Sequence, residues 1–365
     1  MATRTTYPPR RLRPRRSCLA VPGSSEKMLA KAQGLDADQV FLDLEDSVAP
    51  DVKEEARPLV VDALRDGDWG DKVRVVRVND VSTRWTLGDL QHVVSNTGPG
   101  LLDCIMVPKV EDASQVHFVD HVLTQIERTM GWQDGAIGLE IQIENAAGLT
   151  NADVILAASD RIETFVFGPG DMAAALGMPS LTVGAIQPDY PGDHWHWVLM
   201  RVLVAARNRG VLAIDGPYAQ IRDVEGFREV ATRSRVLGFD GKWVLHPGQI
   251  APANEIYGVS REAYERAEDI LDAYADATQR ERKGAVMFGE EMIDEASRKM
   301  AEVNALKGRA AGLQRREVPE GVPFHERAEW RREHHEAAAG AGILSNANRL
   351  GASIDAEVDR GVDRR

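Results

Sequence analysis

Acidic side chains stand at the ends of several short apolar segments of this chain. Asp43, Glu45 and Asp46 follow one such segment, Glu144 closes a second, and Asp171 comes just after a third. If these segments are parallel strands of one barrel, their carboxyl ends share a rim and the five carboxylates lie close together. Like charges at short range repel one another unless a cation neutralises them. The pattern therefore predicts a cation site.

The ligand types indicate which cation this is. Oxygen ligands without His or Cys favour a hard ion such as Mg²⁺, which often takes one or two protein carboxylates and leaves its other positions to water and substrate. We expect Glu144 and Asp171 to be the ligands, because the segments that carry them would be adjacent strands. The alternative is that these carboxylates only cap the helices that follow. For Asp46 in particular, a turn-forming role competes with a role in binding.

A basic side chain is expected at the same rim. Arg77 ends a Val-rich segment, so its guanidinium would face the carboxylates. A planar guanidinium suits a substrate carboxylate or an oxygen on which negative charge develops. Arg77 is therefore a candidate for both substrate binding and catalysis.

Eight short segments rich in Val, Ile and Phe are the candidate strands that position these residues. They are residues 18–21, 40–44, 73–78, 105–107, 137–143, 165–167, 211–214 and 243–245. Amphipathic helix patterns occupy residues 51–64, 112–130, 195–209 and 224–237. Strand–helix units in series predict an α/β fold, a closed (β/α)₈ TIM barrel, with an open doubly wound sheet as the alternative.

Composition divides the chain into four parts. They are a basic disordered arm at residues 1–15, a TIM-barrel catalytic domain at 16–277, a small helical C-terminal appendage at 278–313, and a charged, mostly disordered tail at 314–365. Helices are expected at residues 261–277 and 294–306, with a Gly-containing loop at 283–288 between them.

Bulk properties exclude some classes of function. The formal net charge of −13 disfavours non-specific binding of nucleic acid. No apolar run reaches the roughly 20 residues of a membrane span. The two cysteines, Cys18 and Cys104, lie in apolar segments without a metal-type partner nearby, which is typical of buried thiols in a reducing cytoplasm. We expect a cytoplasmic protein without a nucleic-acid or membrane partner.

Several motifs resemble those of a known superfamily. They are Val21-Pro22-Gly23-Ser24, Val76-Arg77-Val78-Asn79, Val107-Pro108-Lys109-Val110 and the segments 42–50, 142–148 and 167–171. On these motifs the chain resembles the citrate lyase β-subunit/HpcH-HpaI aldolase superfamily over roughly residues 16–306. Residues 195–197, 215–218 and 241–247 make it most similar to the malyl-CoA/β-methylmalyl-CoA lyases.

The resemblance implies roles for individual residues. Mg²⁺, for which Mn²⁺ is a possible substitute, would bind Glu144 and Asp171. Glu45 and Asp46 would hold metal-bound waters, and Arg77 would contact the substrate. Lys31 stands at the basic position expected beside coenzyme A.

The resemblance also implies an oligomer. A C-terminal Asp of one subunit would complete the site of its neighbour in a homotrimer or hexamer, and the matching residue is Asp294.

The implied reaction is the reversible cleavage of (S)-malyl-CoA, or β-methylmalyl-CoA, to glyoxylate and acetyl-CoA, or propionyl-CoA. The partners would be an acyl-CoA and a small 2-oxo acid. Arg77 would stabilise the developing negative oxygen, and Asp294 would protonate the enolate carbon. The alternatives are a malyl-CoA thioesterase, a citramalyl-CoA or citryl-CoA lyase, and a non-catalytic binding protein.

Overall fold

The computed structural model describes residues 13–179, 182–280 and 282–334. The chain divides into two compact units, with the boundary between Gly258 and Val259. Each unit is described separately below.

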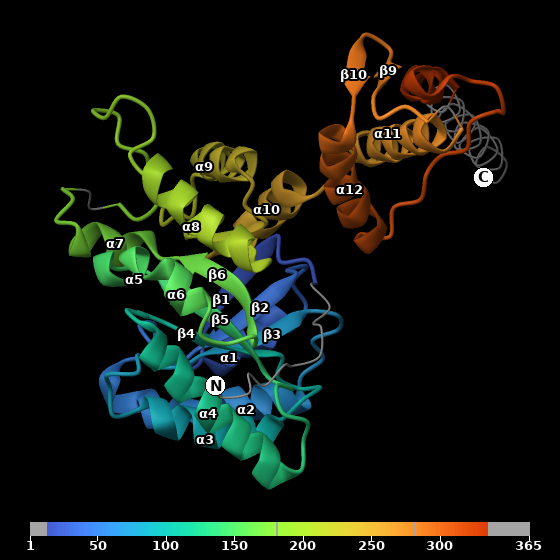
Figure 1. Ribbon diagram of the computed structural model, residues 1–365. Helices are drawn as coiled ribbons and strands as arrows, with labels where there is room; N and C mark the ends of the chain where they lie inside the picture. The colour runs from blue at the N-terminus through green and yellow to red at the C-terminus, as the bar shows by residue number, and fades with distance from the viewer. Residues whose placement is uncertain (1–12, 180–181, 281, 335–365) are drawn as a thin grey trace, which may run out of the picture. The chain divides into compact units, whose positions relative to one another are not determined.

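The first unit is built on a closed parallel barrel (Figure 1). Its strands are β1 Ser17–Pro22, β2 Gln39–Asp43, β3 Val73–Arg77, β4 Cys104–Val107, β5 Gly138–Ile143, β6 Ile162–Phe167, β7 Leu212–Asp215 and β8 Gly241–Val244. Each strand pairs in parallel with the next, and β8 pairs with β1. Closure confirms the predicted TIM barrel and excludes the open doubly wound sheet. All eight predicted segments form strands.

Helices follow the strands and enclose the barrel (Figure 1). They are α1 Glu26–Gln33, α2 Lys53–Asp66, α3 Thr86–Thr97, α4 Ala113–Met130, α5 Ala146–Thr150, α6 Ala152–Leu156, α7 Pro169–Ala175, α8 His196–Arg209, α9 Val224–Leu237 and α10 Ile250–Tyr257, with 3₁₀ turns η1 Pro50–Val52 and η2 Pro247–Gln249. The four predicted helices are all present. A capping box explains the start of α4, since Asp112 accepts from the backbone and Gln115 reaches back to it.

Two layers of buried side chains hold the barrel together. The outer layer packs apolar faces of the strands against the helices. The inner layer fills the barrel and includes Cys18, Phe41, Cys104 and Trp243. Both cysteines are buried thiols outside any disulfide, as expected. Because side chains alternate along each strand, the same inward-facing rows end in polar residues at the carboxyl rim.

Arg15 closes the amino-terminal end of the barrel interior. Its guanidinium donates to Gln39 at 2.7 Å, Glu140 at 3.0 Å and Glu163 at 2.5 Å, and all four side chains are buried. A register shift between β5 and β6 falls beside Glu140. The predicted arm boundary at residue 15 is therefore wrong, because a guanidinium that neutralises two buried carboxylates belongs to the core. Residues 1–12 of the predicted arm lie outside the described residues.

The second unit begins earlier than expected. It contains α11 Arg261–Gln279, a two-stranded hairpin of β9 Val286–Phe288 and β10 Glu291–Ile293, α12 Glu295–Ala310 and the 3₁₀ turn η3 Phe324–Glu326. We expected α11 to end the barrel domain at residue 277. Instead it packs against α12, and Ala267, Ala301 and Ala305 form their shared core. The predicted loop at 283–288 is wrong in its second half, where β9 pairs with β10.

The segment after α12 is ordered as far as the structure describes it. Arg315, Arg316 and Arg331, here called the arginine strap, bind acidic residues along α11. Arg316 pairs with Glu265 at 2.7 Å, and Arg331 pairs with Asp269 at 2.6 Å. The prediction of a disordered tail from residue 314 is thus wrong for residues 314–334, because the strap arginines find buried carboxylates there. Residues 335–365 lie outside the described residues.

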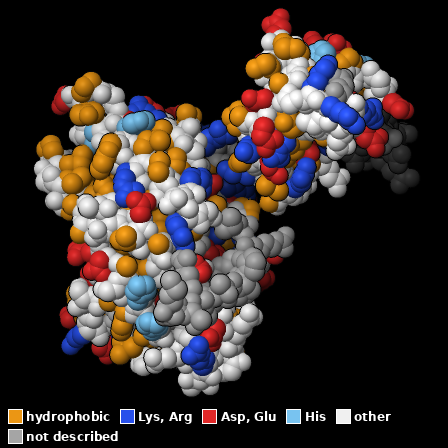
Figure 2. Space-filling model, viewed as in Figure 1, with side chains coloured by type: hydrophobic (Ala, Val, Ile, Leu, Met, Phe, Trp, Pro, Cys, Tyr) orange, Lys and Arg blue, Asp and Glu red, His pale blue; other side chains and the backbone are white. Residues whose placement is uncertain are grey.

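The surface of the first unit mixes charges with scattered apolar side chains (Figure 2). Exposed large apolar residues occur on helices α6, α8 and α9 and directly after α7, and they are Val154, Leu176, Trp197, Val204 and Val236. Within the described part of the chain, every helix is too short or too polar to cross a membrane.

Candidate active site

Arg77 is clamped at the carboxyl end of β3 by Asp43 of the neighbouring strand. The two residues are register partners, and the guanidinium binds both carboxylate oxygens of Asp43 at 2.7 Å. Burial raises the pKa of Asp43, but the Arg77 guanidinium outweighs it and holds that pKa below the usual range. The two-point contact with Asp43 therefore fixes the position of the Arg77 guanidinium.

Aromatic rings and a second set of polar groups surround the same guanidinium. It lies 5.7 Å from the ring centroid of Phe41 and 5.0 Å from that of Trp243, distances typical of cation–π contacts. Its Nη1 atom lies 3.2 Å from Glu45 and 3.5 Å from Gln142. The Nη1 edge thus faces the carboxylates at the rim, as the sequence predicted.

Glu144 is buried just beyond the end of β5. One carboxylate oxygen accepts from the amide nitrogen of Gln142 at 2.5 Å, and the other accepts from the backbone N–H of Lys109 at 2.9 Å. Burial and the nearby carboxylate of Asp171 raise the pKa of Glu144 to about 8. A cation bound beside Glu144 would offset the cost of burying its charge and the repulsion from Asp171.

A glycine makes room for Glu144. A Cβ atom at Gly168 would lie 2.5 Å from both Cβ and Oε2 of Glu144, so only glycine fits beside this side chain. Asp171 follows in the first turn of α7, with its side chain 46% exposed. The pair combines one buried and one accessible carboxylate.

This pair suits Mg²⁺. Among the described residues, no group of three or more His, Cys, Asp or Glu side chains is arranged to hold a metal. Mg²⁺ does not require such a group, because it keeps several waters and takes one or two protein carboxylates. The placement of a buried carboxylate, Glu144, near the accessible carboxylate of Asp171 favours a cation at this pair, in line with the raised pKa of Glu144.

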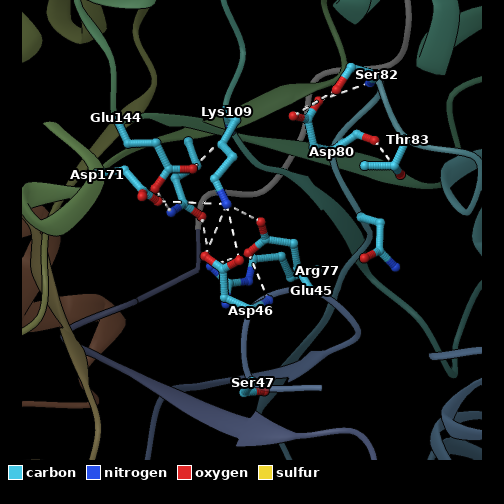
Figure 3. Close-up of polar contacts among 12 residues, drawn as sticks. Glu45, Asp46, Ser47, Arg77, Asp80, Ser82, Thr83, Lys109, Glu144 and Asp171 are labelled. Carbon is cyan, nitrogen blue, oxygen red and sulfur yellow. Dashed lines mark hydrogen bonds and ion pairs between the residues drawn. The ribbon is translucent and has the colours of Figure 1, made fainter. Parts of the chain in front are cut away.

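Lys109, which sequence reasoning did not assign to the site, lies in the middle of these carboxylates. Its ammonium group forms ion pairs with Glu45 and with Asp46 at 3.0 Å, and lies 3.7 Å from Asp171 (Figure 3). Burial lowers the pKa of Lys109, but the carboxylates of Glu45 and Asp46 raise it above the ordinary value. The lysine is therefore a stable cation of the site.

The position of Lys109 in the sequence could have identified it as a site residue. Lys109 stands two residues after β4, at the same rim as the predicted site residues. Its backbone φ of 53° is unusual, since Lys109 and Arg282 are the only described residues other than glycine with positive φ. Such strain often marks functional positions, but it cannot be read from residue type.

Glu45 and Asp46 follow β2 and reach Lys109 from one side (Figure 3). Glu45 is buried, and burial raises its pKa above the ordinary value. The turn after β2 is held by Asp43, which accepts from the backbone N–H groups of Glu45 and Ser47. The Asp46 carboxylate accepts hydrogen bonds from Lys109 instead. These contacts favour a role in the charged cluster over a turn-forming role.

Two further predicted site residues, Lys31 and Asp294, have other surroundings. Lys31 lies exposed in the last turn of α1. Asp294 lies in the second unit, where it caps α12 by accepting from the backbone of Ala296 at 2.9 Å and Ser297 at 3.1 Å. The backbone N–H of Ser297 is the main cause that lowers the pKa of Asp294. The roles of Lys31 and Asp294 therefore stay predictions.

Known proteins are similar to this chain in sequence and in fold. The model of the HpcH/HpaI aldolase/citrate lyase family matches residues 16–247. An L-malyl-CoA/β-methylmalyl-CoA lyase from Cereibacter sphaeroides is 39% identical over 305 residues, which cover 81% of this chain and 95% of that enzyme. A (3S)-malyl-CoA thioesterase from the same species is 34% identical over 276 residues, covering 76% and 88%.

A solved structure gives a similar result. Protein CitE from Mycobacterium tuberculosis, in complex with magnesium, acetoacetate and coenzyme A, matches with a TM-score of 0.63 and 31% identity. The match covers 83% of this chain and 99% of CitE.

Proposed function

Given that the chain belongs to the HpcH/HpaI aldolase/citrate lyase family, we propose that it is a Mg²⁺-dependent carbon–carbon lyase that cleaves (S)-malyl-CoA or β-methylmalyl-CoA. The lyase class rests on the family match and on a relative that is 39% identical over most of both chains. The single structural observation in favour is the Glu144–Asp171 pair beside the clamped guanidinium of Arg77.

Glu144 and Asp171 are the residues that would hold Mg²⁺. When bound there, the ion would supply Lewis-acid chemistry, lowering the pKa of a 2-hydroxyl group on the substrate. The protein keeps Glu144 in place through Gln142 and the backbone of Lys109. Because these contacts exist before substrate arrives, little reorganisation is needed during the reaction.

Arg77 would stabilise the oxygen on which negative charge develops when the C2–C3 bond breaks. Its clamp by Asp43 and its cation–π contact with Trp243 hold the guanidinium at one position. A fixed cation in a buried site stabilises developing charge more strongly than a mobile one in water. The expected products of (S)-malyl-CoA are glyoxylate and acetyl-CoA.

Asp294 would be the acid that protonates the enolate carbon, or the base that removes this proton in the reverse direction. We propose that it acts in the site of a neighbouring subunit of a homotrimer or hexamer. Asp294→Asn should lower turnover by about 10²- to 10⁴-fold and leave Mg²⁺ binding unchanged. Full turnover by this variant would remove Asp294 from the mechanism.

The test of the reaction is an assay of the purified protein with malyl-CoA, β-methylmalyl-CoA, citramalyl-CoA and citryl-CoA, with each product identified by mass spectrometry. We expect glyoxylate and acetyl-CoA from malyl-CoA, loss of activity in EDTA, and recovery with Mg²⁺ or Mn²⁺. Pyruvate or oxaloacetate as the main oxo acid would instead assign the chain to citramalyl-CoA or citryl-CoA.

Thioester hydrolysis is the second candidate, and the thioesterase that is 34% identical to this chain favours it. The same assay separates the two reactions, because hydrolysis yields free malate and coenzyme A without glyoxylate.

A further inference from the structure

The carboxylates at the rim of the barrel already have a cation of their own. The Lys109 ammonium contacts Glu45 and Asp46 and lies 3.7 Å from Asp171 (Figure 3). Its side chain is 26% exposed, so it is neither locked in the core nor free in solvent. The acidic rim can therefore be balanced without a bound metal.

The backbone at Lys109 is built to place this side chain. A φ of 53° is costly for a residue with a Cβ atom, and it persists only where surrounding contacts enforce it. Here the Lys109 N–H donates to Glu144 at 2.9 Å. One residue thus contacts a proposed metal ligand through its backbone and the facing carboxylates through its side chain.

A dication at Glu144 and Asp171 would lie near this ammonium group. Two positive charges within several ångströms repel one another, and both are attracted by the same carboxylates. The lysine therefore opposes metal binding electrostatically, while its backbone N–H keeps Glu144 oriented for it.

We propose that Lys109 is a tethered competitor of Mg²⁺, whose ammonium group weakens metal affinity and stabilises the metal-free site. This inference rests on the proposed metal site at Glu144 and Asp171 and goes beyond it, because it assigns a regulatory role to a residue that is not a ligand. A competitor of this kind keeps metal exchange reversible and prevents repulsion among the carboxylates when no metal is bound.

The test is Mg²⁺ titration calorimetry on the full-length, EDTA-treated chain. Lys109→Met removes the charge at similar length, and we expect it to tighten Mg²⁺ binding by roughly 10- to 100-fold. Lys109→Arg keeps the charge and should stay within about threefold of the unmodified protein, given that the Coulomb term is retained.

Lys72→Met is the matched control. Its amino group donates to the backbone of Gln33 beside the amino end of β3, away from the carboxylates. It removes the same charge and should leave Mg²⁺ affinity unchanged. If Lys72→Met tightened Mg²⁺ binding as much as Lys109→Met does, the change in net charge alone would explain the effect. That result would overturn the proposal.

Thermal melting supplies a second readout. In EDTA, Lys109→Met should melt at a lower temperature than the unmodified protein, because the carboxylates lose their counter-charge, and Mg²⁺ should raise its melting temperature by more. If Lys109→Met does not fold, Lys109→Gln replaces it in both measurements.

Unchanged or weaker Mg²⁺ binding by the neutral variants would overturn the competitor role while leaving the proposed function intact. If the unmodified chain itself binds no Mg²⁺, the proposed metal site fails, and the competitor role fails with it.

Discussion

Glu144 depends on the absence of a side chain at position 168. Because a Cβ at that position would meet both Cβ and Oε2 of Glu144, the fit is set by one atom. The turn at Gly168 thus does more than end β6, since it leaves the space in which a proposed metal ligand stands.

Gly168→Ala should therefore displace Glu144 and weaken Mg²⁺ binding by about tenfold or more, because a misplaced ligand loses its geometry. Calorimetric titration measures the change. Gly34→Ala is the control, since a Cβ there meets nothing within 4 Å. An alanine at 168 that binds Mg²⁺ normally would show that Glu144 is not the ligand.

At the scale of elements, residues at the carboxyl ends of the strands form the candidate site, and a residue at their amino ends closes the barrel interior. Asp43 and Arg77 pair because they are register neighbours on β2 and β3. At the opposite end, Arg15 precedes β1 and neutralises Glu140 and Glu163 from β5 and β6. Both ends of the barrel thus depend on ion pairs between separate segments of the chain.

Arg15→Met should destabilise the first unit by about 3–5 kcal/mol, because it leaves buried carboxylates without their cation. Urea denaturation followed by tryptophan fluorescence measures the free energy of unfolding. Arg13→Met breaks a more exposed pair with Asp103 and should cost about 0–1 kcal/mol. Equal losses in the two variants would contradict a special role for Arg15.

The arginine strap should release α11 in acid. Burial raises the pKa of Glu265, but its hydrogen bond with Arg316 outweighs burial and holds the pKa below the ordinary value. A carboxyl group whose pKa is lower in the folded state than in the unfolded state stabilises the fold when the pH is above its unfolded-state pKa. This contribution is lost as the pH falls through the folded-state pKa.

Hydrogen exchange of residues 315–331, corrected for intrinsic rates, should therefore show protection at pH 7 that declines below about pH 4. Arg316→Gln should lose this pH dependence and show weak protection throughout. Stronger protection from hydrogen exchange at low pH would contradict this prediction.

The sequence predicted the barrel and most of its rim because strand ends are marked by a change from apolar to charged residues. Arg77, Glu144 and Asp171 are found this way. Arg15 is not, since it lies in a run of arginines typical of a disordered arm, and its partner Glu140 is 125 residues away. Lys109 was missed because its place depends on a backbone conformation that its residue type disfavours.

At the scale of the whole molecule, the chain carries its proposed acid and its proposed metal ligands in different units. Glu144 belongs to the first unit, and Asp294 belongs to the second. A site shared between subunits would make assembly a condition of activity.

Subunit mixing tests this arrangement. Glu144→Gln and Asp294→Asn should each be inactive alone, whereas a coexpressed mixture should recover up to about a quarter of full activity, because random pairing joins an intact barrel with an intact Asp294 in that fraction of sites. No recovery in mixed oligomers would place Asp294 in its own chain's site or outside catalysis.

The filled amino-terminal end of the barrel also bears on the order in which products leave. Arg15 and the layer with Phe41 and Trp243 occupy the interior below Arg77, so within the described residues the approach is from the carboxyl ends of the strands. In the proposed reaction the oxo acid would lie beside Glu144 and Asp171, the proposed metal ligands, and we expect it to leave after acetyl-CoA. Steady-state kinetics should then show glyoxylate as a competitive inhibitor against malyl-CoA and acetyl-CoA as a mixed one.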